Sequence, residues 1–193
     1  MMQIHLIRHG KTAANEQKLY CGSTNLPLSD DGINELAQLR RQGVYPKNID
    51  LYFTSGLLRT EQTLDLLYGK AHREVLVQFA EYNFGQFEMK SYEELKTHNV
   101  YQNWITDKTG LAACPGGECK QGFGRRILEG LKILEKKAQP NKAIAAICHG
   151  GVITCLMEHL FPGEKHFYEW QPVPGRGYTL IYTRNGLQAY KNI

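Results

Sequence analysis

Long apolar runs are absent from this sequence of 193 residues. No stretch reaches the roughly eighteen apolar residues that a membrane-spanning helix needs. Residues 1–5 also lack the charged and then apolar layout with which a signal peptide begins. We therefore expect a cytoplasmic protein that has no membrane partner.

Cysteine is sparse, and its spacing fits no known metal site. The chain has five cysteines, an odd number, and no CxxC pair of the kind that binds zinc. It also has no P-loop, the glycine-rich segment that cradles nucleotide phosphates. We therefore expect reduced thiols, and neither a metal ion nor another cofactor.

Positive charge is in modest excess and is not gathered in one place. The formal net charge is +4, and the densest basic pairs are Arg40-Arg41, Arg125-Arg126 and Lys136-Lys137. All three pairs lie in segments with helical spacing, so we expect them on solvated helix faces. A nucleic-acid footprint would need a basic stripe with interleaved aromatic residues, which the sequence lacks. We expect no nucleic-acid partner.

Short apolar segments alternate with segments of helical spacing. This alternation predicts an α/β fold, a three-layer sandwich whose mainly parallel sheet carries helices on both faces, formed as a single domain over residues 1–193. The predicted strands cover 4–7, 51–54, 75–77 and 143–148, and a closing antiparallel hairpin covers 178–183 and 187–190. The predicted helices cover 57–67, 92–96 and 152–160, with another between Ser29 and Gly43 and a long one from Phe123 to an end at Pro140.

Charged and polar residues directly follow three of these strands. The first strand ends in Arg8-His9-Gly10, and the strand over 143–148 leads into His149-Gly150-Gly151. The strand over 51–54 leads into a helix with Arg59 in its first turn. Ligands of open α/β sheets bind beyond the carboxyl ends of the strands, so we expect these side chains to converge on one crevice. Arginines beside helix starts favour an anion such as phosphate there.

Five blocks of the sequence carry a family resemblance. They are residues 6–12 with Asn15, 22–32, 55–60, 81–85 and 149–153. In this order they resemble the histidine phosphatase superfamily, the phosphoglycerate mutase-like branch, over about residues 4 to 160. The triplet Arg8-His9-Gly10 alone would be a weak signal, but five blocks in the right order are a strong one.

The resemblance implies a role for each residue at the strand ends. His9 would attack phosphorus and become phosphohistidine, which a neutral histidine can do near pH 7 because its ordinary pKa is about 6.5. The groups that would hold the phosphoryl oxygens are Arg8, Asn15, Arg59, His149 and the backbone N–H of Gly150. Such a pocket suits phosphoryl transfer, because catalysis there depends mostly on positioning and on stabilising negative charge.

A carboxylic acid completes the predicted site. By the resemblance, Glu81 would protonate the leaving alkoxide and then deprotonate the water that cleaves phosphohistidine. Glu88 lies seven residues on, in a second short acidic block. It stays open as the alternative acid.

Three functions are compatible with these residues. The expected function is that of a metal-independent phosphatase, a phosphoric monoester hydrolase acting on phosphorylated small metabolites, and the compact size resembles the broad-specificity and alpha-ribazole phosphatase-like enzymes. The alternatives are a phosphotransferase of the phosphoglycerate mutase type and a non-catalytic phospho-ligand binding protein. Gly117 follows Glu81 by only 36 positions, whereas the mutases resemble longer chains with an insertion there. A binding protein would not need both a nucleophile and an acid. We expect a monomer or a homodimer.

Two positions depart from the family pattern. Asn25 stands where an aspartate is common, which we interpret as a variation in helix capping. Cys119 follows Glu118 where the family often has a serine, in a region that usually faces the substrate. The sequence therefore leaves the substrate open.

Overall fold

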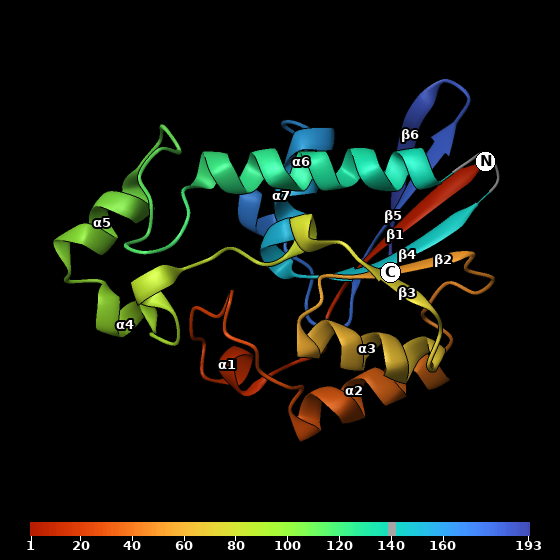
Figure 1. Cartoon of the computed structure of the whole chain (residues 1–193), viewed down its shortest axis with the longest axis horizontal. Helices are drawn as coiled ribbons and strands as arrows, with labels where there is room; N and C mark the ends of the chain where they lie inside the picture. The colour runs from red at the N-terminus through yellow and green to blue at the C-terminus, as the bar shows by residue number, and fades with distance from the viewer. Residues whose placement is uncertain (139–141) are drawn as a thin grey trace.

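The computed structural model describes residues 1–138 and 142–193 (Figure 1). In chain order its elements are β1 (Met2–Arg8), α1 (Ala13–Glu16), α2 (Asp30–Arg41), β2 (Leu51–Thr54), α3 (Leu58–Tyr68), β3 (Arg73–Val75), η1 (Val77–Phe79), η2 (Gly85–Phe87), α4 (Tyr92–Leu95), α5 (Asn99–Thr106), α6 (Lys120–Lys137), β4 (Ala143–Cys148), α7 (Gly150–Leu160), η3 (Phe167–Trp170), β5 (Gly177–Thr183) and β6 (Gly186–Asn192). None of the helices in these two ranges is long and apolar enough to cross a membrane.

The strands form one sheet in the order β3-β2-β4-β1-β5-β6. The neighbours β3 and β2, β2 and β4, and β4 and β1 all pair in parallel. The two last strands run antiparallel, β5 against β1 and β6 against β5. The sheet is therefore mainly parallel with an antiparallel hairpin at one edge, as the sequence predicts. The carboxyl ends of β2, β4 and β1 lie at the same edge of the sheet.

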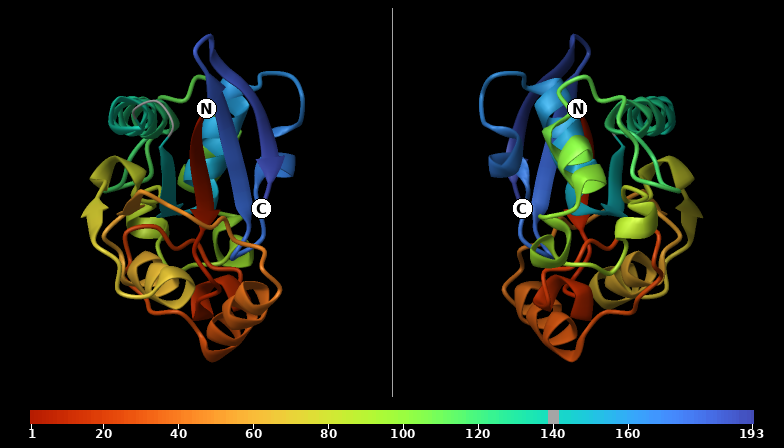
Figure 2. Two further views of the ribbon diagram at one scale, coloured as in Figure 1. Left: turned by 90° about the vertical axis from the view of Figure 1, so that its right-hand side faces the viewer. Right: turned by 90° about the vertical axis from the view of Figure 1, so that its left-hand side faces the viewer.

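Both faces of the sheet are buried because successive side chains of a strand point to opposite sides. In β4, Ile144 and Ala146 belong to the core cluster that includes α6 and α7, whereas Ile147 belongs to the cluster that includes α2 and α3. Figure 1 shows these helix pairs on opposite sides of the strands. Figure 2 shows α2 and α3 side by side at one end of the molecule, with the β5–β6 hairpin at the other. The predicted three-layer sandwich is confirmed.

Local signals determine where α2 begins and ends. Ser29 caps the helix, and its hydroxyl accepts a hydrogen bond from the Gly32 N–H. Acidic residues occupy the first turn and Arg40-Arg41 the last, an arrangement that complements the helix dipole. The chain leaves the helix through Gly43, whose φ of 71° is open to glycine at little cost. The predicted helix between Ser29 and Gly43 is confirmed.

Among the outer segments, one strand is predicted at the wrong residues and one helix is not predicted. The strand expected at 75–77 is β3 over Arg73–Val75, followed by η1, because its pairing partner β2 has no residue beyond Thr54 to offer. Helix α5 lies in a stretch where the sequence predicted no regular structure. Its buried side chains are the aromatic Tyr101 and Trp104, three positions apart, and two residues give too short an apolar pattern to be recognised. The predicted end of α6 at Pro140 lies outside the described residues.

The buried start of β4 offers a test of the two-sided core. Ile144 is fully buried between neighbouring strands and under α6, so Ile144→Ala is expected to lower the free energy of unfolding by about 2–5 kcal/mol. Val75→Ala on the edge strand serves as the control, because Val75 is 56% exposed and its truncation should stay within about 0.5 kcal/mol. Urea unfolding followed by circular dichroism measures both. Equal losses would contradict the described packing.

Candidate active site

The parallel register brings the strand ends together. Arg8 is the pairing partner of Cys148, so the next residues, His9 and His149, leave the sheet side by side. Their ring centroids are 5.1 Å apart. Ser55, which follows β2, lies with its Oγ 2.8 Å from His149 Nε2. The predicted convergence of these strand ends on one place is confirmed.

The tautomer of His9 follows from its contact with the next residue. Its Nδ1 lies 2.6 Å from the carbonyl oxygen of Gly10, and since a carbonyl only accepts, Nδ1 carries the proton. The other ring nitrogen, Nε2, therefore holds a free lone pair. Burial, and then the positive charges of Arg59 and Arg8, lower the pKa of His9 well below 6.5. The ring is neutral near pH 7.

His149 is held by a directional chain of hydrogen bonds. Arg59 Nε donates to His149 Nδ1 at 3.3 Å, so the imidazole proton is on Nε2, which donates to Ser55 Oγ. Ser55 in turn contacts Thr60 Oγ1, whose own proton goes to the carbonyl of Leu57. Burial, the neighbouring His9 and three arginines, Arg126 among them, lower the pKa of His149 well below its ordinary value. Both ring nitrogens are engaged within the protein, so a phosphoryl oxygen would have to replace one of these contacts.

Arg59 lies beneath the two histidines, where it is 1% exposed. It is in the first turn of α3, as predicted. Its Nη1 donates to the Thr24 carbonyl at 2.8 Å and its Nη2 to the Gly22 carbonyl at 2.7 Å. One N–H on each of these nitrogens stays available, and burial lowers the pKa of the guanidinium. A buried cation with two free donors is a ready partner for an anion.

Arg8 lies against the start of α7. Its Nη1 donates to the Pro172 carbonyl at 2.7 Å, while its buried Nε has no hydrogen-bond partner in the described parts of the chain. A Cβ at Gly150 would lie 3.1 Å from the guanidinium carbon, so a larger residue there would push Arg8 away. Burial lowers the pKa of Arg8, and the nearby Glu81 carboxylate opposes that shift. The unpaired Nε–H is a donor awaiting an acceptor.

Glu81 reaches the same helix start from another side. Its Oε2 accepts the Gly151 N–H at 3.0 Å, and its Oε1 accepts the N–H of Tyr82 at 2.9 Å. A Cβ at Gly151 would lie 2.4 Å from Oε1. The two glycines after His149 therefore leave room for Arg8 on one side and Glu81 on the other.

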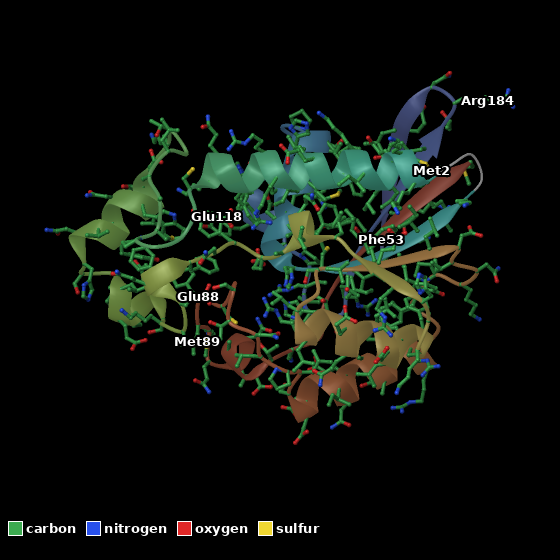
Figure 3. The ribbon with its side chains drawn as sticks, in the orientation of Figure 1. Met2, Phe53, Glu88, Met89, Glu118 and Arg184 are labelled. Atoms are coloured by element: carbon green, nitrogen blue, oxygen red, sulfur yellow. The ribbon has the colours of Figure 1, made fainter. Side chains whose placement is uncertain are left out.

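The carboxylate of Glu88, the alternative acid, is engaged in hydrogen bonds with the loop over residues 22–24. Its carboxylate accepts the backbone N–H groups of Gly22, Ser23 and Thr24 and the Thr24 hydroxyl, together with the N–H of Phe84. Burial acts to raise the pKa of Glu88, but these hydrogen bonds outweigh it and hold the pKa below 4.5. Figure 3 shows Glu88 between the sheet and the α4–α5 region. A carboxylate held ionised by so many donors is poorly suited to give a proton.

Three further predicted positions act as helix caps. The side-chain oxygen of Asn15 accepts from the Thr12 N–H and hydroxyl in the capping box of α1. Asn25 Oδ1 accepts the N–H of Leu58, the first residue of α3, at 2.7 Å, whereas the N-cap residue Leu57 forms no side-chain cap. Cys119 caps α6, its sulfur accepting the N–H of Gly122.

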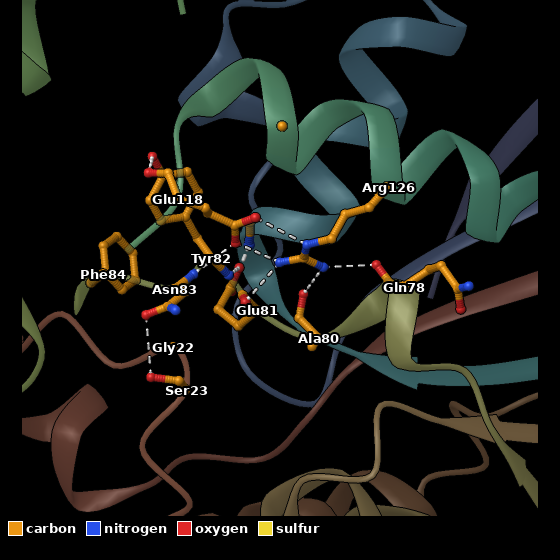
Figure 4. Close-up of polar contacts among 12 residues, drawn as sticks. Gly22, Ser23, Gln78, Ala80, Glu81, Tyr82, Asn83, Phe84, Glu118 and Arg126 are labelled. Atoms are coloured by element: carbon orange, nitrogen blue, oxygen red, sulfur yellow. Dashed lines mark hydrogen bonds and ion pairs between the residues drawn. The ribbon is translucent and has the colours of Figure 1, made fainter. Parts of the chain in front are cut away.

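Ser55, Glu118 and Arg126 also belong to the site, although the sequence did not predict them there. Ser55 directly follows a strand, as His9 and His149 do, and that position was the available signal. The prediction that Arg125-Arg126 lies on a solvated face is wrong for Arg126, which turns inward and pairs with Glu118, Nη2 to Oε1, at 2.6 Å (Figure 4). Only Arg125 of the pair is exposed. Ion pairing between α6 and the loop directly before it leaves no periodic trace in the sequence.

A pocket opens beside Glu81, away from the two histidines. The pocket is lined by residues of three segments, which are the loop over 22–24, the segment over 77–83 and the segment over 117–126. Ser23, Asn83 and Glu118 give this wall a polar character, and Leu57 adds an apolar surface. Together, the site combines a buried cationic pocket, a neutral histidine with a free Nε2 and a carboxylate at the border of a second pocket. That combination suits transfer of a phosphoryl group from an ester.

Known proteins resemble the chain over nearly all of its length. The family model described as histidine phosphatase superfamily (branch 1) matches residues 4–191. An adenosylcobalamin/alpha-ribazole phosphatase of Escherichia coli (strain K12) is 30% identical over 173 residues, which cover 86% of this chain and 84% of that protein. A probable phosphoglycerate mutase GpmB of Yersinia pestis (strain Pestoides F) is 27% identical over 169 residues, which cover 86% and 78%. The crystal structure of a putative alpha-ribazole-5'-P phosphatase from Escherichia coli matches with a TM-score of 0.84 and 26% identity, covering 97% of this chain and 93% of that one.

The buried histidines make stability depend on pH. Burial lowers the pKa of His5, which bonds Thr179, to about 4, and the pKa values of His9 and His149 are lowered too. In the unfolded chain these groups titrate near 6.5, so below that pH the unfolded state binds more protons. The free energy of unfolding is therefore expected to fall as the pH drops from about 6.5 towards 4. Glu88 adds its loss only below 4.5.

Urea unfolding at pH 7, 6 and 5 in a phosphate-free buffer measures this dependence. The matched variant His5→Gln should show a shallower fall, because one histidine that is neutral in the folded state is gone. A free energy of unfolding that stays constant from pH 7 to pH 5 would contradict the described burial.

Proposed function

Since the chain belongs to branch 1 of the histidine phosphatase superfamily, we propose that it is a metal-independent phosphatase that hydrolyses phosphomonoesters of small metabolites through phosphohistidine. One observation carries the proposal: His9 Nδ1 donates to the Gly10 carbonyl at 2.6 Å, which leaves Nε2 with a free lone pair near the buried Arg59 and the half-buried Arg8. A nucleophile held neutral next to cations is what attack on a phosphate dianion requires.

The first step forms the phosphoenzyme. The lone pair of His9 Nε2 attacks phosphorus, the N–P bond forms, and the P–O bond to the leaving group breaks with its electron pair going to that oxygen. Glu81, at the border of the second pocket, supplies the proton that the leaving alkoxide needs. The product that departs is a neutral alcohol.

The second step returns the enzyme to its starting state. Glu81, now ionised, takes a proton from water as the water oxygen attacks phosphorus. The N–P bond breaks, its electron pair returns to Nε2, and inorganic phosphate leaves. Glu81 is protonated again, so protons balance over the cycle.

The remaining residues stabilise charge on the phosphoryl oxygens. Arg8 offers its unpaired Nε–H, and Arg59 offers one N–H on each terminal nitrogen. The Gly150 backbone N–H lies at the start of α7, which favours an anion, and His149 would join by giving up a present contact. Asn15 would donate through its side-chain nitrogen, since its oxygen is engaged in the capping box. These cations take the electrostatic part that a metal ion takes in other phosphatases.

A phosphoglycerate mutase-type phosphotransferase is the second candidate, favoured by the relative that carries that name. The relatives named as alpha-ribazole phosphatases make a ribose phosphate ester of that kind a useful member of any substrate panel. Release of inorganic phosphate from such a panel in EDTA supports the phosphatase. Transfer between positions without release selects the mutase, and tight phosphate binding without turnover selects a binding protein.

The nucleophile can be tested by substitution. His9→Ala is expected to lower kcat by roughly 10⁴-fold or more and to abolish an acid-labile, alkali-stable phosphoenzyme labelled from a ³²P ester, because Nε2 forms the covalent bond. The matched control is His159→Ala, on an exposed turn at the end of α7, which should keep both. A label that persists in the His9 variant would place the nucleophile elsewhere.

The acid can be tested by the dependence on the leaving group. Glu81→Gln is expected to lower kcat/KM for phenyl phosphate by about 10²-fold or more and far less for p-nitrophenyl phosphate, whose leaving group needs little protonation. Glu88→Gln should lower both values together, because it loosens the loop over 22–24 that holds Arg59. The reverse pattern would make Glu88 the proton donor.

A further inference from the structure

The guanidinium of Arg126 is fully occupied inside the protein (Figure 4). Its Nη1 donates to the carbonyls of Gln78 and Ala80 at 2.8 and 2.7 Å, and its Nη2 donates to the carbonyl of Glu81 at 3.0 Å. The remaining two N–H groups go to the Glu118 carboxylate, Nη2 to Oε1 at 2.6 Å and Nε to Oε2 at 3.1 Å. All five donors are therefore used. Although Arg126 lines the second pocket, it has no N–H left for a substrate.

Glu118 also holds the backbone on the C-terminal side of Glu81. Its Oε1 accepts the N–H of Asn83 at 2.8 Å, and the backbone N–H of Glu118 donates to the Asn83 carbonyl at 3.0 Å. The ion pair thus holds the backbone on both sides of Glu81. Arg126 binds the carbonyls of Glu81 and of two residues before it, and Glu118 binds Asn83, two residues after it. Arg126 is fixed in turn by the ring of Phe123, 4.8 Å from the guanidinium carbon.

Glu81 depends more than the other site residues on such side-chain hydrogen bonds for its position. His9 and His149 follow strands directly, and Arg59 is in the first turn of a helix, so the sheet positions all three. Glu81 lies in a segment without helix or strand, between η1 and η2. Besides the N–H groups of Gly151 and Tyr82, its position relative to His9 Nε2 depends on a backbone that is held by Arg126, by Glu118 and by the buried Tyr82 ring, whose hydroxyl donates to the Glu118 carbonyl.

We propose that Arg126 and Glu118 are positioning residues that place Glu81 for proton transfer to the leaving group. The inference rests on the proposed function, in which Glu81 is the acid. Because Arg126 touches Glu81 only through the backbone and has no free donor, its loss should weaken proton transfer and leave the phosphate pocket intact. A small displacement of a catalytic group is enough to cost on the order of 10²-fold in rate.

The test compares phenyl phosphate with p-nitrophenyl phosphate in the full-length chain. Arg126→Gln is expected to lower kcat/KM for phenyl phosphate by about 10–100-fold and for p-nitrophenyl phosphate by less than about 3-fold, with the competitive inhibition constant of inorganic phosphate unchanged. Arg126→Lys keeps the charge but only three donors and no planar fork, so its loss should be intermediate. Glu118→Gln should repeat the pattern of Arg126→Gln. The matched control Arg125→Gln, one residue earlier on the exposed side of α6, should change neither ester.

A double-mutant cycle separates positioning from a general loss of structure. In a Glu81→Gln background, Arg126→Gln should add no further discrimination between the two esters, because the side chain at position 81 can no longer give a proton to the leaving group. Thermal unfolding of each variant verifies that the folded state is compared, and Glu118→Gln serves where Arg126→Gln does not fold.

Each outcome bears on the inference. Equal losses on both esters, in an enzyme whose Glu81→Gln variant does discriminate, would overturn the positioning role alone. A further discrimination in the Glu81→Gln background would overturn it as well. Absence of turnover on every ester by the wild-type protein would overturn the proposed function and this inference with it.

Discussion

The buried Arg59 and the half-buried Arg8, neither of which has a full set of hydrogen-bond partners among the described residues, are the constraint on which the site depends. Arg59 is almost fully buried, and Arg8 keeps an Nε–H that no described residue accepts. Taking a cation out of water is costly unless it is paired, so an anion that shares the pocket would stabilise this arrangement. Burial first, and then these charges, lower the pKa values of His9 and His149 and so keep both rings neutral. The same buried, positively charged surroundings would therefore serve both the binding of phosphate and the proposed nucleophile.

The rest of the site is arranged to hold these cations in place. Glu88 binds the backbone N–H groups of the loop over 22–24, whose carbonyls in turn accept from Arg59. Arg59 Nε then determines which nitrogen of His149 carries the proton. A carboxylate at one end of this chain of contacts is thus linked to the His149 imidazole at the other. The two acidic residues, seven positions apart, are held differently: Glu88 accepts five hydrogen-bond donors, while Glu81 accepts two backbone N–H groups and lines the second pocket.

The sequence predicts the site residues that the ends of strands position. It misses the contacts that side chains make with backbone groups far away in the sequence. Apolar strands that end in polar residues must meet at one edge of a parallel sheet, so the convergence of His9, His149 and Arg59 follows from the order of the residues alone. The partners of Arg126 and Glu88 cannot be derived in this way, because each side chain bonds backbone groups tens of residues away, and backbone groups are the same in every residue. The prediction of the edge strand β3 fails for a similar reason, because its partner β2 and not its own residues determines where β3 ends.

The two halves of the site are therefore built to different rules. The phosphate half rests on strand ends and helix starts, where a change of residue disturbs the sheet itself. The leaving-group half rests on irregular segments around Ser23, Asn83 and Glu118, joined by hydrogen bonds from side chains to backbone. The loop over 22–24 joins the two halves, because its carbonyls also accept from Arg59. Relatives named for different reactions, at 27–30% identity, are consistent with such a division.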